Sequence, residues 1–162
     1  MIRLWSGSAG KNLGITSRGV IRGDIETMND YKEISIENYC IQELECRCND
    51  CNNQFSDYMT LNYELVCFED EVGKKFFLPT YGIYGYLYLL EDLVDEWNAN
   101  DKITKNVTEK FEKKLSEITQ HDVTIYNKVR CPFCKKYNVF INKRNTLVNC
   151  PINWLKINIS KI

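Results

Sequence analysis

Two pairs of cysteines dominate the chemistry that this sequence offers. Two residues separate Cys48 from Cys51, and the same spacing recurs between Cys131 and Cys134. This spacing lets one tight turn present both sulfurs to a single ion while backbone N–H groups point at them. Two such turns supply four thiolates, which is the tetrahedral ligand set of structural zinc. The sequence therefore predicts one Zn²⁺ ion per chain, bound by Cys48, Cys51, Cys131 and Cys134.

Two further cysteines leave the ligand set partly open. Cys46 lies two residues before Cys48 and offers an alternative partner for the first pair. Cys150 precedes Pro151, as a third metal-binding turn would allow, but it has no second cysteine two residues away. A packing role for Cys150 is therefore favoured over ligation.

The double Cys-x-x-Cys pattern, with a short polar turn after each pair, resembles the two knuckles of a zinc ribbon. The resemblance covers the knuckles and their flanking strands, a minority of the chain, and it implies a scaffold and not a function. The long separation of the knuckles, over residues 52–130, departs from a simple ribbon. Either a folded segment is inserted there or the two pairs belong to different sites.

Hydrophobic periodicity predicts the α+β class. Alternation of period two predicts strands, and spacing near 3.6 predicts helices, the first capped by Thr80 and the second by an Asn106–Glu109 capping box. The expected strands are 2–5, 15–26, 33–46, 58–68, 76–78, 123–129, 139–141 and 153–160, and the expected helices are 80–98 and 106–119. A turn is expected at 142–145.

These elements predict a single domain over residues 1–162. Residues 1–56 and 123–162 are expected to build a small β-rich zinc-ribbon scaffold. Residues 57–122 are expected to form an inserted strand-helix-helix lobe between the knuckles. The N-terminal strands are expected to pack beside the C-terminal ones.

Charge is unevenly distributed although the formal net charge is only −1. Residues 1–23 carry four basic side chains and no acid, and residues 123–162 carry eight basic side chains and no acid. All 22 acidic residues lie between positions 24 and 122. Such segregation produces surface fields of opposite sign unless the two parts neutralise each other in the fold.

The basic C-terminal lobe suggests the first function. Its cations can neutralise phosphates, and the aromatic residues among them, Phe133, Tyr137 and Phe140, can stack on bases. We therefore expect a non-enzymatic protein that contacts nucleic acid or a nucleoprotein complex, unless these rings are ribbon core and the lysines only keep it soluble. The expected contacts are Lys128, Arg130, Lys135, Lys136, Lys143 and Arg144.

The predicted helix 80–98 suggests an alternative function. It carries aromatic residues beside a row of carboxylates, and such a face can dock on a basic groove of another protein. The chain would then be a protein-binding adaptor or inhibitor, of the kind that phages and mobile elements encode. The partner-binding residues would be Glu91, Asp92, Asp95 and Glu96.

Catalysis and membrane attachment find little support. The only histidine, His121, is followed by Asp122 and Val123, so the glutamate of the His-x-Glu motif of a zinc deaminase is missing. A carboxylate nuclease that uses acids near 24–26 and 69–74 is a lesser alternative. The sequence contains no long apolar run and no signal-peptide pattern, so we expect a cytoplasmic protein with reduced thiols and neither a membrane nor a small-molecule partner.

Overall fold

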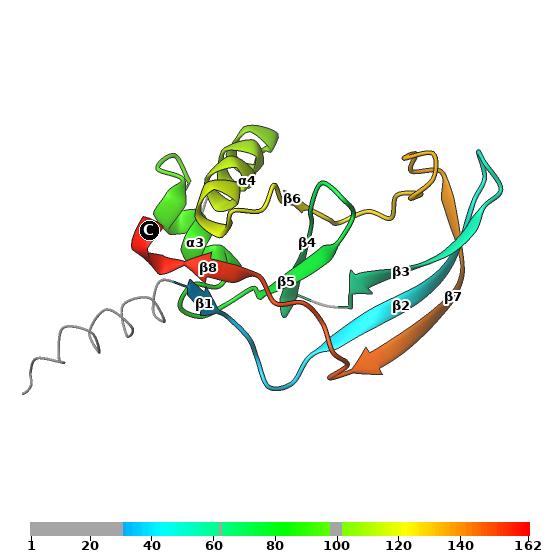
Figure 1. The fold of residues 1–162 in the computed structure, drawn as a ribbon, viewed down its shortest axis with the longest axis horizontal. Helices are drawn as coiled ribbons and strands as arrows, with labels where there is room; N and C mark the ends of the chain where they lie inside the picture. The colour runs from blue at the N-terminus through cyan, green and yellow to red at the C-terminus, as the bar shows by residue number, and fades with distance from the viewer. Residues whose placement is uncertain (1–30, 62, 98–101) are drawn as a thin grey trace, which may run out of the picture.

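The computed structural model describes residues 31–61, 63–97 and 102–162. Within these ranges the chain forms three small antiparallel sheets and two α-helices (Figure 1). Helix accounts for 20% and strand for 35% of the described residues, which confirms the predicted α+β class. The strands expected at 2–5 and 15–26 lie outside the described residues. In Figure 1 the helices gather at one end, and the longest sheet reaches toward the other.

The longest sheet, here called the knuckle sheet, consists of β2 (Cys40–Cys48), β3 (Gln54–Thr60) and β7 (Val139–Val148) in the order β3-β2-β7. Alternation places Leu44, Cys46 and Cys48 on one buried face of β2. The turn expected at 142–145 is wrong, because β7 continues through it. A β-bulge near Cys46 absorbs one extra residue of β7, so pairing resumes on both sides of the irregularity.

The second sheet joins β4 (Leu65–Glu69), β5 (Lys75–Pro79) and β6 (Thr124–Ile125) in the order β5-β4-β6. The single strand expected over 58–68 is wrong, because β3 ends at Thr60 and a turn precedes β4. Tyr63, in that turn, is 87% exposed, although its spacing placed it on the apolar face. The strand expected at 76–78 is confirmed within β5.

A two-stranded sheet pairs β1 (Tyr31–Glu33) with β8 (Lys156–Asn158), and a short 3₁₀ helix, η2 (Ile159–Lys161), follows. The expected strand 33–46 begins only at β2. The chain before β2 bends, and Ile34 is buried in the core beside the helices instead of lying in a sheet. The strand expected at 153–160 is reduced to β8, because Asn158 caps η2 and the chain turns there.

Both helices differ from their expected bounds. The helix expected over 80–98 is α3 (Tyr86–Leu93), and its N-cap is Gly85 and not Thr80. The chain turns first, and the N–H of Leu87 donates to the carbonyl of Thr80 at 3.0 Å. The second helix, α4 (Lys105–Thr119), is capped by Thr104, whose hydroxyl accepts from Val107 N at 3.4 Å. The Asn106–Glu109 capping box is therefore wrong.

The largest hydrophobic core in the described part of the chain lies between the second sheet, the two helices and β8. A smaller cluster lies under the knuckle sheet. The chain before the second knuckle and the chain after it both contribute residues to the large core. The division into scaffold and insert stays a prediction. None of the described helices has the length and apolar character needed to cross a membrane. The fully buried members of the large core include Phe68, Leu78, Leu89, Leu90, Phe111, Leu115, Leu155 and Ile157.

Gly85 is required where α3 begins. A Cβ at this position would lie 2.6 Å from the carbonyl oxygen of Tyr81 and 3.0 Å from that of Pro79, and both atoms belong to the backbone. Gly85→Ala should therefore lower the free energy of unfolding by about 1–3 kcal/mol, the usual cost of overpacking. Urea unfolding measures this. Glu91→Ala, on the exposed side of the same helix, should stay within about 0.5 kcal/mol of the parent. Equal stability of the parent and Gly85→Ala would contradict the argument.

Candidate metal centre

The four predicted ligands converge at the tip of the knuckle sheet. Cys48 ends β2 and Cys51 lies in the turn toward β3, whereas Cys131 and Cys134 lie in the loop before β7. The register that pairs Cys48 with Val139 sets the second loop beside the first. The four Sγ atoms all lie within 4.8 Å of one another. The Sγ–Sγ distances are 3.5 Å for Cys48–Cys134 and 3.6 Å for Cys51–Cys131.

The two cysteine turns share one backbone geometry. In each, the residue after the second cysteine is left-handed, with φ of 62° at both Asn52 and Lys135. The N–H of this residue donates to the carbonyl of the first cysteine, at 2.9 Å in both turns. The N–H of the first cysteine donates to the carbonyl of the residue that follows the left-handed one. These bonds join Cys48 N to Asn53 O at 2.9 Å and Cys131 N to Lys136 O at 2.8 Å. This repeated turn aims both sulfurs of each pair at a common point.

The turns also act on the charge of the sulfurs. The backbone N–H of Asn53, assisted by its side-chain amide at 3.3 Å, lowers the pKa of Cys51 to about 6. The backbone N–H of Lys136 has the same effect on Cys134, but burial and the neighbouring sulfurs outweigh it and raise the pKa of Cys134 to about 12. Like charges this close disfavour each other, so a cation is needed before all four sulfurs ionise together.

The spacing of the sulfurs fits a metal ion. A tetrahedral centre with metal–sulfur bonds of about 2.3 Å has sulfur–sulfur edges of about 3.8 Å. The Sγ–Sγ separations of 3.5 Å for Cys48–Cys134 and 3.6 Å for Cys51–Cys131 lie close to that edge. Four thiolates also suit a soft or borderline ion and occupy every position of a tetrahedral shell. These residues, here called the four-cysteine cluster, can therefore hold a metal ion: Cys48, Cys51, Cys131 and Cys134.

Cys46 and Cys150 lie outside the four-cysteine cluster. Cys46 packs under the knuckle sheet with Leu44 and Val129, and burial raises its pKa to about 11. Cys150 packs against the group of apolar residues around Ile41. The alternative ligand pairs that the sequence left open are thus not the ones that the fold brings together.

Three of the six predicted nucleic-acid contacts stand at the second knuckle and reach solvent. Lys128, Lys135 and Lys136 are exposed. The Nζ of Lys128 lies 5.3 Å from the ring centroid of Tyr137. Lys136 has a weak, exposed ion pair with Asp50 at 4.0 Å. The fold therefore leaves these three cations available for a ligand.

The other three contacts have different surroundings. Lys143 and Arg144 are neighbours on β7 and therefore point to opposite faces of the knuckle sheet. Lys143 Nζ lies 3.7 Å from Glu45 Oε2, and Arg144 Nη1 donates to Gln42 Oε1 at 3.1 Å. Arg130 pairs with the buried carboxylate of Glu69. The positive charge of this group is thus partly neutralised within the fold.

The acidic row of the alternative function is also divided. Glu91 and Asp92 are exposed on α3, but the helix ends before Asp95 and Glu96, which are exposed in the following turn. The carboxylate of Glu96 pairs with Lys110 of α4. Shortening of the expected helix therefore separates residues that helical spacing would have aligned.

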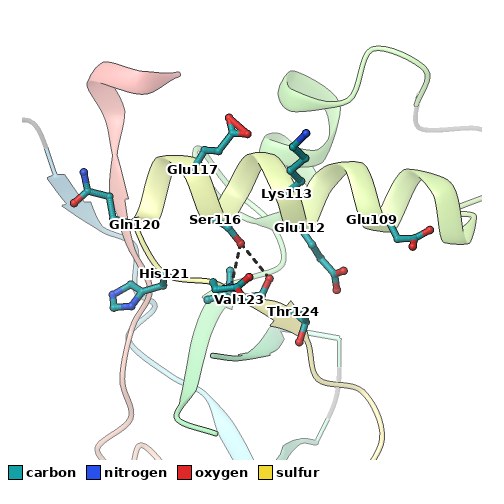
Figure 2. A pocket seen from close by; sticks show the side chains of 10 residues that line it. Glu109, Glu112, Lys113, Ser116, Glu117, Gln120, His121, Val123 and Thr124 are labelled. Carbon is teal, nitrogen blue, oxygen red and sulfur yellow. Dashed lines mark hydrogen bonds between the residues drawn. The ribbon is translucent and has the colours of Figure 1, made fainter. Parts of the chain in front are cut away.

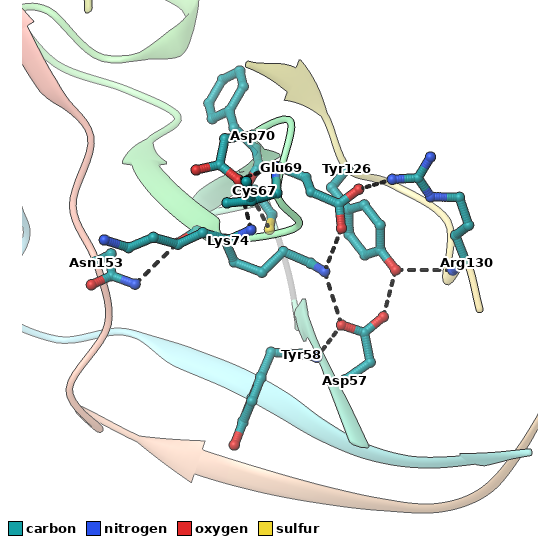
Figure 3. A network of polar contacts seen from close by, with 12 residues as sticks. Asp57, Tyr58, Cys67, Glu69, Asp70, Lys74, Tyr126, Arg130 and Asn153 are labelled. Carbon is teal, nitrogen blue, oxygen red and sulfur yellow. Dashed lines mark hydrogen bonds and ion pairs between the residues drawn. The ribbon is translucent and has the colours of Figure 1, made fainter. Parts of the chain in front are cut away.

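A partly buried network of charged groups, which the sequence did not predict, joins the knuckle sheet to the second sheet (Figure 3). Lys75 Nζ lies 3.1 Å from Asp57 Oδ1 and 3.0 Å from Glu69 Oε2. Asp57 and Glu69 are only 7% and 8% exposed. One signal was available: Glu69 and Lys75 occupy opposed positions at the ends of a hairpin, where a cross-strand ion pair is common.

Tyr126 and Arg130 complete this network. The Tyr126 hydroxyl donates to Asp57 Oδ2 and accepts from Arg130 N at 2.9 Å. Two effects raise the pKa of Tyr126: burial is the larger, and the hydrogen bond to Asp57 is the second. The Arg130 guanidinium pairs with Glu69 Oε1. Because Arg130 immediately precedes Cys131, the network fixes the start of the second knuckle against the second sheet.

A hollow of about 620 Å³ lies along the outer side of α4 and includes His121 (Figure 2). The nearby Ser116 hydroxyl accepts from Val123 N at 3.0 Å and lies 3.4 Å from Val123 O, so it serves the backbone after the helix. The His121 ring packs on Phe76, with centroids 4.8 Å apart. Ser116 and His121 thus both have structural contacts within the fold. The expectation of a non-enzymatic protein stays a prediction.

Comparison with protein-family models, with curated proteins and with solved structures finds no match for this chain. The functional argument therefore rests on the geometry of the four-cysteine cluster and of the surfaces around it.

Proposed function

We propose that this protein is a structural zinc protein that binds nucleic acid through its second knuckle. The binding surface, here called the second-knuckle surface, lies within residues 128–137, which contain no acid. The observation that most supports this function is that exposed cations lie there among exposed aromatic rings. The surface comprises Lys128, Phe133, Lys135, Lys136 and Tyr137.

Zinc is the ion best suited to the four-cysteine cluster. Four-thiolate shells with the Cys-x-x-Cys spacing are typical of structural zinc, which needs no open coordination position. Cys48 and Cys131 are fully buried and the other two are half-buried, so protein surrounds most of the shell. The role of the ion would be to join the two knuckles, which lie far apart in the sequence, into one rigid tip.

The rigid tip supports binding because it fixes the positions of the cations. The turn that contains Lys135 is held by its N–H bond to Cys131 O at 2.9 Å. Lys136 follows directly and uses its own carbonyl in the same turn. Lysine side chains on a fixed backbone can contact phosphates with little loss of backbone entropy on binding. Neutralised phosphates release counterions, so affinity should fall as salt rises.

The charge-reversal variant Lys135→Glu with Lys136→Glu tests this function. It should weaken binding to a fluorescent oligonucleotide at least ~10-fold in low salt. If each lysine contacts one phosphate, the slope of log affinity against log salt should become shallower by about 0.7–0.9 per contact. Fluorescence anisotropy across a salt series measures both quantities, and metal content reports whether the knuckle is intact.

Lys113→Glu with Lys114→Glu is the matched control. It reverses two exposed adjacent lysines on α4, away from the second knuckle, and it changes the net charge by the same amount. Its affinity should stay near that of the parent. An equal loss in both variants would mean that net charge alone governs binding, and binding by neither the parent nor the variants would reject the proposed function.

The adaptor or inhibitor alternative has less support because its acidic row is divided and Glu96 is paired with Lys110. The nuclease alternative also has less support. Glu69 already contacts Lys75 and Arg130, whereas a magnesium site needs carboxylate oxygens that are free to bind the ion. The acids at 24 and 26 lie outside the described residues.

A further inference from the structure

Two aromatic rings of the second-knuckle surface are far more exposed than a structural role requires. Phe133 is 60% exposed and Tyr137 is 52% exposed. The core under the knuckle sheet is built without them, from Leu44, Cys46 and Val129. The Phe133 ring has an edge contact with Phe55, at 6.5 Å between centroids, which orients it without covering it. Both rings therefore present apolar surface to solvent, and Lys128 Nζ lies over one face of Tyr137.

Exposed rings of this kind have a specific use among cations. A base that is not paired offers a flat π-face on which an aromatic side chain stacks, and each stack is worth about 5-fold or more in affinity. A duplex offers no such face to a ring on a protruding turn, because its bases are stacked on each other and only their edges reach the grooves. Lysines alone would bind both forms through their phosphates.

The arrangement of rings and lysines matches a single strand. Lys128 Nζ lies over one face of the Tyr137 ring, 5.3 Å from its centroid, so a base would stack on the opposite face with this cation close by. Lys135 and Lys136 lie between Phe133 and Tyr137 in the chain and are exposed like them, so cations and rings share one short segment. Rings that stack on base faces bind every base alike, so this surface should show little sequence preference.

We propose that the second-knuckle surface binds single-stranded nucleic acid, with Phe133 and Tyr137 as stacking platforms. This inference rests on the proposed function and narrows it from nucleic acid in general to unpaired strands. Both rings lie outside the metal shell, so they can be changed without removal of a ligand.

The test compares an oligothymidylate of about 12 nucleotides, a length within the range of site sizes of single-strand binders, with a duplex of the same length. The full-length, metal-loaded protein should bind the single strand at least ~10-fold more tightly. Phe133→Ala and Tyr137→Ala should each weaken single-strand binding by about 5-fold or more and leave the salt slope and the duplex affinity unchanged. Phe133→Trp should retain single-strand affinity, because indole also stacks.

Tyr81→Ala is the matched control. Tyr81 is 65% exposed and lies before α3, so its loss should leave both affinities unchanged. Equal affinity for the two ligands, with no effect of either ring variant, would overturn this inference but leave the proposed function in place. Binding of neither ligand would overturn both. If one ring variant lost its metal or its helical signal, its weaker binding would reflect misfolding. The other, folded variant would then report the effect of stacking.

Discussion

A Cys131→Ser variant should bind well under one metal ion per chain and lose more than about 3 kcal/mol of stability, because structural zinc contributes an apparent ~10–16 kcal/mol to small zinc-dependent folds. Much of that binding free energy is folding free energy. Cys131 is fully buried, and its Sγ lies 3.6 Å from Cys51 Sγ at the junction of the two knuckles. A hydroxyl there is a poor ligand, so the second knuckle should detach from the first.

Elemental analysis and thermal unfolding measure this outcome. Cys150→Ser is the control, since it removes a half-buried cysteine that lies outside the four-cysteine cluster. That variant should keep one ion per chain and most of the stability. If Cys131→Ser retained a full equivalent of metal and the parent melting temperature, the four-cysteine cluster would not be a structural metal site.

Replacement of Lys75 by methionine should lower the free energy of unfolding by about 3–5 kcal/mol, the usual cost of breaking a buried ion pair. The ammonium of Lys75 lies 3.1 Å from Asp57 and 3.0 Å from Glu69, and both carboxylates are buried. Removal of the cation leaves two buried carboxylates, of which Glu69 keeps its ion pair with Arg130 and Asp57 keeps the hydrogen bond from Tyr126. Such uncompensated charge is costly even though an intact buried pair adds little net stability.

Lys110→Met provides the matched comparison. It removes the cation of the exposed pair with Glu96 and should cost no more than about 1 kcal/mol. Urea unfolding of both variants gives the two costs directly. A small cost for Lys75→Met, equal to that for Lys110→Met, would show that water reaches the network of Asp57 and Glu69 and that it is not a structural link.

Local sequence signals were enough for the candidate site. The Cys-x-x-Cys spacing favours a turn that is held by local hydrogen bonds, within residues 48–53 and within residues 131–136. Such a turn depends little on the rest of the fold, and the demand of a metal for four thiolates pairs the two turns. The α+β class was predictable for a similar reason, because the helical repeat of α4 and the apolar run of β5 are strong local patterns.

Element boundaries were less predictable because several local signals competed. Thr80 and Asn106 are both favourable N-cap residues, yet Gly85 and Thr104 occupy the caps. The backbone between Thr80 and Gly85 forms a turn whose hydrogen bonds and close backbone contacts composition alone does not reveal. Tyr63 is a further example. Its position fits the period-two alternation of a strand, but it lies exposed in the turn between β3 and β4.

The sequence by itself determined the two Cys-x-x-Cys pairs, the fold class and the concentration of basic residues after position 122, whereas the structure excluded Cys46 and Cys150 from the four-cysteine cluster. Only the tertiary structure decided which of those basic residues remain available. Sheet register brings Asp57, Glu69, Lys75, Tyr126 and Arg130 together from three separate segments, and Arg130 is thereby neutralised while Lys135 is left in solvent. Charge pairing depends on distances of a few ångströms between residues far apart in the chain, and only the packing of the two sheets sets those distances.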